Sequence, residues 1–202
     1  MSRVIASAAV SLDGFIADTA DAVGPLFDWY NNGPVEFYGS DPGRPFKVSQ
    51  VTADYLGEFW PKVGAVVMGR HLFDLTNGWN GVPAVGDHVF VVTHQPPTDW
   101  PFPDAPFTFV NDLEEAITQA KAYCGDDRIV SVTAGNLTGQ ALEAGLIDEL
   151  ALDLVPVVFG TGVPFFGTYT GPQQLFENPR VVEGDRVTHL HYTITAAPDG
   201  RR

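Results

Sequence analysis

Three segments of this chain place small, polar or basic residues directly after a run of apolar, mostly β-branched residues. They are Val66-Val67-Met68-Gly69-Arg70-His71, Val91-Val92-Thr93-His94 and Val132-Thr133-Ala134-Gly135-Asn136. A strand that ends at glycine and turns into a helix presents free backbone N–H groups and the positive end of the helix dipole, which together favour a phosphate. Because parallel strands end at one edge of a sheet, the three segments jointly predict a dinucleotide site at that edge. Singly, each segment is also typical of ordinary strand–helix packing.

Two histidines and one cysteine are further candidates for chemistry. His189 and His191 alternate along a predicted strand, so both imidazoles fall on one face and form a geometrically suitable metal pair. The sequence offers no evident third ligand, so we expect a solvated or partner-facing surface and predict no metal site. Cys124 falls on the apolar face of a predicted helix without an evident activating base, and we expect it to serve packing.

Strands and helices must position these groups. Hydrophobic runs predict strands over residues 4–10, 65–68, 88–93, 107–110 and 129–133. Helices are predicted over 51–59, over 111–124 and after Asn136, which is a candidate N-cap, up to a stop at Gly145. In the second of these helices Asn111 and Glu114 resemble a capping box. Since strand and helix signals alternate from residue 65 onward, we expect a largely parallel sheet with right-handed crossovers.

The C-terminal region follows a different pattern. Residues 181–182 and 187–195 are strand-like and flank Gly184-Asp185, which predicts a two-residue hairpin turn closing one edge of the sheet. We expect one domain over residues 1–195, followed by a flexible tail over 196–202. Residues 18–50 are rich in Gly, Pro, Asn and Asp and punctuated by aromatic residues. A segment of that length commonly forms a wall over a substrate, and the alternative is a surface insertion.

Composition restricts the partners of the chain. Its 202 residues carry a net charge of −14 and are 45% hydrophobic. Binding to nucleic acid or to an anionic membrane needs a basic surface, so neither is expected. The single cysteine excludes an intramolecular disulfide, and no run of roughly 18 apolar residues predicts a membrane span. We therefore expect a cytoplasmic protein.

The chain resembles the dihydrofolate reductase-like family, and most closely the reductase domain of bifunctional riboflavin-biosynthesis deaminase-reductases. The resemblance rests on Ser11-Leu12-Asp13-Gly14-Phe15-Ile16-Ala17, Val67-Met68-Gly69-Arg70-His71-Leu72-Phe73 and Gly145-Leu146-Ile147-Asp148-Glu149-Leu150, followed by Pro156 and Phe159-Gly160. It implies an α/β fold with a mixed, mostly parallel central sheet, helices on both faces and a C-terminal antiparallel hairpin. The deaminase zinc motif is missing, so only the reductase half applies.

The resemblance also implies NADPH as the cofactor. Carried over by position, Ser7 and Ile16 would border the nicotinamide, and Thr93 and His94 would face the adenosine 2′-phosphate. The remaining cofactor contacts would be Gly69, Arg70, His71 and Leu72 at the phosphates and ribose, and Gly135, Asn136, Leu137 and Thr138 at the pyrophosphate. Two departures from the family pattern, Ala134 for glycine and His94 for arginine, keep NADH as an alternative.

The implied function is an NAD(P)H-dependent reductase that transfers a hydride to a small heterocyclic, pterin- or pyrimidine-like substrate or to a carbonyl. Asp54 resembles the placement of the acid that contacts the pterin in dihydrofolate reductases; the alternative is an exposed helix-start carboxylate. Asp28 and Trp29 are candidate substrate contacts, with simple loop packing as the alternative. A homodimer is expected from the resemblance, through the C-terminal hairpin or its sheet edge. The competing hypothesis is a non-catalytic protein that binds a small ligand and retains the fold with a degraded cofactor site.

Overall fold

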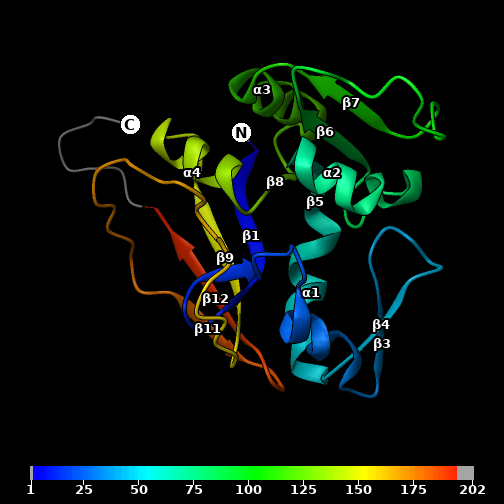
Figure 1. Cartoon of the computed structure of the whole chain (residues 1–202). Coiled ribbons are helices and arrows are strands. Elements are labelled where there is room, and N and C mark those ends of the chain that lie inside the picture. Colours follow the sequence, from blue (N-terminus) through cyan, green and yellow to red (C-terminus); the bar gives the residue numbers. More distant parts are fainter. Residues whose placement is uncertain (1, 195–202) are drawn as a thin grey trace.

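A computed structural model describes residues 2–194, which form one large sheet, two small two-stranded sheets and helices on both faces of the large sheet (Figure 1). The predicted tail over 196–202 lies outside the described residues. The strands are β1 Arg3–Ser11, β2 Phe15–Ala17, β3 Val35–Tyr38, β4 Pro45–Val48, β5 Val63–Gly69, β6 His88–Val92, β7 Phe107–Val110, β8 Ile129–Thr133, β9 Glu149–Val155, β10 Val163–Pro164, β11 Arg180–Glu183 and β12 Thr188–Thr193. The α-helices are α1 Gln50–Phe59, α2 Arg70–Thr76, α3 Leu113–Cys124 and α4 Asn136–Glu143, and the 3₁₀ helices are η1 Gly24–Asn31, η2 Trp60–Lys62 and η3 Gly78–Gly81.

The large sheet has eight strands in the order β11-β12-β9-β1-β8-β5-β6-β7. Each neighbouring pair from β9 to β7 is parallel. Strands β12 and β11 complete the other edge as an antiparallel pair. The predicted fold class, a mixed and mostly parallel sheet between helices with a C-terminal antiparallel hairpin, is confirmed.

Successive residues of β1 point to opposite faces of the large sheet, and each face is covered by different helices. Val4 and Ala6 pack in the core cluster that contains α3 and α4. Ile5 and Ala9 point to the opposite face, where they pack in the clusters that contain α2 and α1 respectively. The two-residue period of a strand therefore separates a fully apolar face from a face that also carries Ser7.

The start of α3 differs from the expected capping box. Asp112 is the N-cap, and its carboxylate accepts a hydrogen bond from the Glu115 backbone N–H at 2.9 Å. Asn111 instead bonds His94. An ionised carboxylate at the helix start also complements the helix dipole, so it is the stronger cap.

Two further local predictions are wrong. The N-cap of α4 is Gly135, and Asn136 is the first helical residue, with its side-chain oxygen accepting from the Thr168 backbone N–H at 3.1 Å. The C-terminal hairpin loop spans four residues, 184–187, because Glu183 pairs with Thr188. The left-handed backbone of Arg186, at φ 57°, reverses the chain there.

The long segment over 18–50 forms structure of its own. It contains η1 and the antiparallel pair β3–β4, which stand beside α1 (Figure 1). Aromatic rings hold it together: Tyr30 and Phe46 have ring centroids 4.6 Å apart, and Phe46 lies 5.6 Å from Trp60. The segment therefore packs as a wall against the sheet side that carries Ser7. Among the described helices, none has the length and apolar character needed to cross a membrane.

Candidate active site

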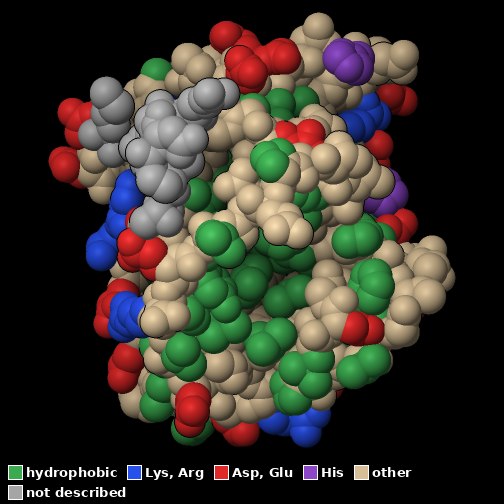
Figure 2. Space-filling view, turned by 90° about the vertical axis from the view of Figure 1, so that its left-hand side faces the viewer, with side chains coloured by type: hydrophobic (Ala, Val, Ile, Leu, Met, Phe, Trp, Pro, Cys, Tyr) green, Lys and Arg blue, Asp and Glu red, His purple; other side chains and the backbone are tan. Residues whose placement is uncertain are grey.

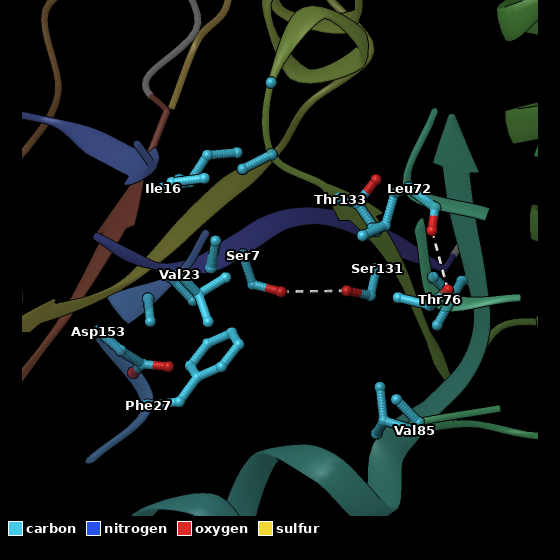
Figure 3. A pocket seen from close by; sticks show the side chains of 18 of the residues that line it. Ser7, Ile16, Val23, Phe27, Leu72, Thr76, Val85, Ser131, Thr133 and Asp153 are labelled. Carbon is cyan, nitrogen blue, oxygen red and sulfur yellow. Dashed lines mark hydrogen bonds between the residues drawn. The ribbon is translucent and has the colours of Figure 1, made fainter. Parts of the chain in front are cut away.

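A cavity of about 1300 Å³ lies between the sheet, α1, α2 and the wall formed by residues 18–50. Ser7 on β1 and Ser131 on β8 face each other on its sheet side, with hydroxyl oxygens 3.1 Å apart. Figure 3 shows Phe27 and Asp153 together on one side of this serine pair, and Leu72 on the other side. Within this one cavity, we call the part beside Gly69 and Gly135 the glycine compartment and the part beside Phe27, Tyr30 and Asp153 the aromatic compartment.

Eight of the predicted cofactor residues line this cavity, and most of them form the compartment beside the strand ends. They are Ser7, Ile16, Gly69, His71, Leu72, Gly135, Asn136 and Leu137. Gly69 ends β5 as the N-cap of α2, and Gly135 is the N-cap of α4. The fold thus brings two of the three predicted strand–helix turns to a single cavity.

Gly135 needs a backbone that only glycine adopts readily. Its φ is +102°, and an added Cβ would meet nothing closer than the Ile16 Cδ1 at 3.9 Å, so the space in front of the turn is open. Its N–H donates to the Phe165 carbonyl at 2.7 Å. Ala134 is not among the described residues with positive φ, so alanine fits there without backbone strain.

The two basic residues of the β5–α2 turn are placed differently. Arg70 is outside the cavity lining; its Nε donates to the Asp74 carboxylate at 2.7 Å, and its guanidinium also bonds the Gln95 carbonyl. His71 lines the cavity and lies 3.0 Å from the Asp21 carboxylate. His71 therefore links α2 to the segment over 18–50 at an exposed part of the cavity.

Three other predicted cofactor residues are outside the lining. Thr93 is buried and its hydroxyl donates to the Gln95 carbonyl at 3.2 Å. His94 is exposed and its ring bonds Asn111. Thr138 is fully buried, and its hydroxyl donates to the Thr133 carbonyl at 2.9 Å. The hydroxyl of Thr138 thus secures the β8–α4 turn from within.

The predicted substrate pair Asp28 and Trp29 does not line the cavity. Asp28 is exposed, whereas Trp29 is 1% exposed and packs edge-on against His189, with ring centroids 5.5 Å apart. The neighbouring Phe27 and Tyr30 line the cavity instead. A 3₁₀ helix has three residues per turn, so positions 27 and 30 of η1 share the face that turns inward.

Asp54 is also absent from the cavity lining. It is exposed on α1, and its carboxylate accepts from the Gln50 side-chain amide at 2.7 Å. Tyr55, Leu56 and Phe59 are the residues of α1 that reach the cavity. The inward face of the helix therefore carries apolar and aromatic groups.

The carboxylate that does reach the cavity among aromatic side chains is Asp153 on β9, which the sequence reasoning missed. It stands directly opposite His189 in the β9–β12 register, and the His189 Nδ1 lies 2.6 Å from its Oδ1. Burial first, and the Asp153 charge second, raise the pKa of the Tyr30 hydroxyl far above its usual range. Tyr30 is therefore neutral beside an acidic neighbour.

His189 connects Asp153 to helix α1. It is fully buried, its ring stacks on Tyr55 with centroids 4.3 Å apart, and its Nε2 lies 3.1 Å from the Thr52 hydroxyl. The Ser49 hydroxyl in turn donates to Thr52 at 3.1 Å. The predicted surface position of His189 is wrong, because β11 covers the edge of its strand and α1 covers its face.

His191 forms the neighbouring pair on the same face. Its Nε2 lies 2.7 Å from the Glu149 carboxylate, which also accepts from Arg3 at 2.7 Å. Each histidine thus pairs with its own carboxylate. In the part of the chain that the structure describes, no three His, Cys, Asp or Glu residues are grouped so that they could hold a metal ion.

One sequence signal could have found Asp153. In the run from Glu149 to Val155, alternate residues Leu150, Leu152 and Leu154 point to one face, and the other face carries two carboxylates, Glu149 at the strand start and Asp153 inside the strand. A carboxylate inside a central strand needs a partner or a ligand. Its partner, His189, follows 36 residues later and carries no local signature.

The mixed, mostly parallel sheet between helices is a dihydrofolate reductase-like fold. The chain belongs to the family of RibD C-terminal domains, whose family model matches residues 2–183. Membership of this family supports a reductase-type function.

Individual relatives agree with this assignment. The uncharacterised protein YwjB of Bacillus subtilis (strain 168) is 27% identical over 186 residues, which cover 91% of this chain and 93% of YwjB. A putative riboflavin biosynthesis protein from Shewanella sp. PV-4 has a TM-score of 0.70 at 23% identity and covers 96% of this chain and 99% of its own. Acinetobacter baumannii RibD has a TM-score of 0.61 at 16% identity, over 96% of this chain and 58% of RibD. The two structures show the same fold.

Proposed function

We propose that the protein is an NAD(P)H-dependent reductase that transfers a hydride to a small heterocyclic or carbonyl substrate. The observation that carries the proposal is the continuity of the cavity. One space joins the glycine turns at Gly69 and Gly135 to an aromatic compartment, and Ser7 lies where the two parts meet. A nicotinamide cofactor and its substrate must share such a space, because the two reacting carbons have to touch.

The residues of the glycine compartment fit a dinucleotide. Open space in front of Gly135 admits a pyrophosphate close to the backbone, and the positive end of the α4 dipole, which begins at Asn136, would favour its negative charge. We assign Gly69, Arg70, His71 and Leu72 to the phosphates and ribose. Gly135, Asn136, Leu137 and Thr138 are assigned to the pyrophosphate, Ser7 and Ile16 to the nicotinamide, and Thr93 and His94 to the 2′-phosphate. For Arg70, Thr93 and His94, which lie outside the cavity lining, this requires a change of partner on binding, since all three are already hydrogen-bonded. Thr138 is fully buried and would act by holding the turn through its hydrogen bond to Thr133.

The side chains that line the cavity would orient the cofactor and the substrate and exclude water from them. The bound cofactor would supply the hydride. Ile16 and Leu72 are apolar walls of the cavity, and Phe27 and Tyr30 are aromatic walls. The Ser7 and Ser131 hydroxyls are positioned to hydrogen-bond groups at the junction. Asp153 takes the role for which Asp54 was a candidate, because Asp153 reaches the cavity.

Titration of the purified protein with NADPH and NADH, followed by fluorescence, tests the proposal. Saturable binding of NADPH is the expected result. Because His94 replaces the arginine of the family and lies outside the cavity lining, we expect NADH to bind within about tenfold of NADPH, or ~1.4 kcal/mol. A folded protein that binds neither nucleotide would contradict the reductase and favour the non-catalytic ligand-binding alternative.

We also propose a homodimer located in the cytoplasm. Figure 2 shows a hollow on one face of the molecule that is surrounded mainly by hydrophobic side chains, with acidic and basic side chains at the periphery. Surfaces of this kind bind a ligand or another protein. For the second copy we propose the C-terminal hairpin or its sheet edge, where β11 is the outermost strand of the large sheet. Light scattering coupled to size-exclusion chromatography measures the mass directly, and a mass of 21.8 kDa at micromolar concentration would refute the dimer.

A further inference from the structure

A second cavity, of about 420 Å³, lies near the starts of the parallel strands, whereas the glycine turns lie at their ends. Its lining includes the first residues of β1, β8 and β9, together with residues of β11, β12 and the C-terminal half of α1. Tyr55 and Phe59 of α1 line both cavities and therefore form part of the partition between them. The proposed hydride transfer uses none of the charged side chains that line this second cavity.

The second cavity is positively charged within a strongly acidic chain. Among the described residues, its lining holds three of the eleven lysines and arginines but only two of the 25 acidic residues. The basic ones are Arg3, Lys62 and Arg180, and the acidic ones are Glu58 and Glu149. One positive charge therefore remains when both carboxylates are ionised, without any contribution from His191. In a chain whose net charge is −14, such a local surplus attracts anions.

The carboxylates of this lining already have partners. Oε1 of Glu149 accepts from Arg3 at 2.7 Å, and its Oε2 lies 2.7 Å from Nε2 of His191. Oε2 of Glu58 accepts from Arg180 at 2.6 Å. Both oxygens of Glu149 are thus used within the chain, and its side chain is only 9% exposed. Little acceptor capacity is left for a cationic ligand.

Hydrogen-bond donors, in contrast, are left over. A guanidinium carries five N–H hydrogens, and within the described chain Arg3 and Arg180 each bond a carboxylate through Nη1 alone. Arg180 first, and Lys62 to a smaller extent, lower the pKa of Glu58, which places the Lys62 ammonium near this pair. Lys62 itself makes no hydrogen bond or ion pair with another described residue, and the buried Tyr55 hydroxyl has no partner among them either. A ligand that brings negatively charged acceptors therefore complements the cavity.

The second cavity also has an apolar part, to which Ile5 and Ile129 of the sheet and Phe59 of α1 contribute. Pockets for small organic ligands measure roughly 300–1,000 Å³, so this cavity admits a single ring with a charged substituent. We propose that the second cavity binds a small organic anion, whose carboxylate or phosphate group is held by the three basic side chains and whose flat apolar body rests on Phe59. This site is separate from the proposed reductase site.

Isothermal titration calorimetry in a phosphate-free buffer tests the proposal with four probes. Phenyl phosphate and benzoate carry both parts of the ligand, inorganic phosphate carries the anion alone, and benzyl alcohol carries the ring alone. We expect at least one of the two ring anions to bind saturably with a Kd below about 1 mM, and the tighter of the two identifies the anionic group. The anion alone should bind at least about fivefold more weakly, because it buries no apolar surface, and benzyl alcohol should show no saturable binding.

Substitutions of basic residues show whether the charge of the lining is responsible. Lys62→Gln removes one positive charge without leaving a carboxylate unpaired, and should weaken the tighter ring anion about three- to fivefold. The double variant Lys62→Gln/Arg180→Gln turns the positive surplus into a negative one and should weaken it at least about tenfold. Lys47→Gln is the matched control, because Lys47 is an exposed lysine of β4 that lines neither cavity, and it should bind within about twofold of the wild type. Thermal unfolding followed by circular dichroism shows that each variant is folded.

Histidine NMR signals show which cavity is occupied. The chain has five histidines, of which His191 lines the second cavity and His71 the first. With the ring signals assigned by substitution of each histidine, the bound ring anion should shift the signals of His191 and leave those of His71 unchanged.

Four outcomes would overturn the proposal. They are no saturable binding of either ring anion, equal affinity for the ring anion and inorganic phosphate, a double variant that binds as tightly as Lys47→Gln, or shifts at His71 in place of His191. Because none of these measurements uses a nicotinamide nucleotide, the anion site and the reductase are tested independently. Failure of NADPH and NADH to bind would refute the reductase and leave the anion site standing.

Discussion

Two helical glycines provide a sharp test of the packing around the β8–α4 turn. An alanine Cβ at Gly139 in α4 would lie 2.2 Å from the Phe166 carbonyl oxygen, about 1.2 Å short of the 3.4 Å at which ordinary contact begins. An alanine Cβ at Gly57, on the exposed side of α1, would meet nothing within 4 Å. Both substitutions improve helix propensity by about 0.5–1 kcal/mol, so this contribution cancels when the two variants are compared.

The difference between the variants is therefore the cost of the contact with a backbone atom. Overpacking of this kind costs about 1–3 kcal/mol. For a chain of this length each kcal/mol shifts Tm by about 2–4 °C, so Gly139→Ala should unfold roughly 2–12 °C below Gly57→Ala. Gly57→Ala should itself be slightly more stable than the wild type. Urea and thermal unfolding followed by circular dichroism measure both differences, and a Gly139→Ala variant as stable as Gly57→Ala would refute the packing argument.

The same variant reports on the proposed cofactor turn. The carbonyl that must move belongs to the segment around Phe166, whose neighbours hold the turn: Phe165 accepts from Gly135, and Thr168 donates to Asn136. Gly139→Ala should therefore weaken NADPH binding, and Gly57→Ala should not. A destabilised Gly139→Ala that binds NADPH normally would leave the packing argument standing and contradict the assignment of the turn to the pyrophosphate.

Two further predictions concern titratable groups. Burial raises the pKa of Glu149, but the hydrogen bonds from His191 and Arg3 outweigh burial and hold this pKa below its ordinary value. Glu149→Gln should therefore lose stability at neutral pH. That loss, measured as the difference in urea midpoints, should shrink as the pH falls through the folded-state pKa of Glu149; a difference independent of pH would contradict it. Burial raises the pKa of the Cys124 thiol, so iodoacetamide should alkylate it slowly in the native protein and rapidly in urea. Alkylation of native protein at the rate of free cysteine would show that the thiol is accessible.

The sequence predicts those parts of the fold that carry a local signal. The alternating aromatic and β-branched run Phe107–Val110 and the helix that ends at Cys124 appear where their patterns place them. The alternation of strands and helices along the chain is likewise sufficient to predict the parallel sheet, because right-handed crossovers leave few alternative topologies. The errors at the starts of α3 and α4 are shifts of one residue: Asp112 is the cap in place of its polar neighbour Asn111, and Gly135 is the cap in place of Asn136.

The aromatic compartment depends on tertiary contacts that no local sequence pattern indicates. Whether Trp29 or its neighbours turn inward is decided by the 3₁₀ geometry of η1, and the pattern of aromatic residues is compatible with either orientation. Asp153 on β9 meets His189 on β12 only because the two strands pair. Asp54 is excluded from the cavity only by the rotation of α1 against the sheet. Such placements follow from tertiary packing, which overrides local preference.

The wall over residues 18–50 is attached to the rest of the chain at few polar points. At the tip of β3–β4, Ser40 bonds the carbonyls of Ala84 and Gly86, and Arg44 bonds the carbonyl of Val82. The segment enters after β2 and leaves before α1, so it interrupts no strand of the large sheet. Insertions, deletions and exchanges can therefore accumulate there without changing the register that sets the glycine turns. One wall of the cavity is therefore built from a segment whose length the register of the large sheet does not restrict.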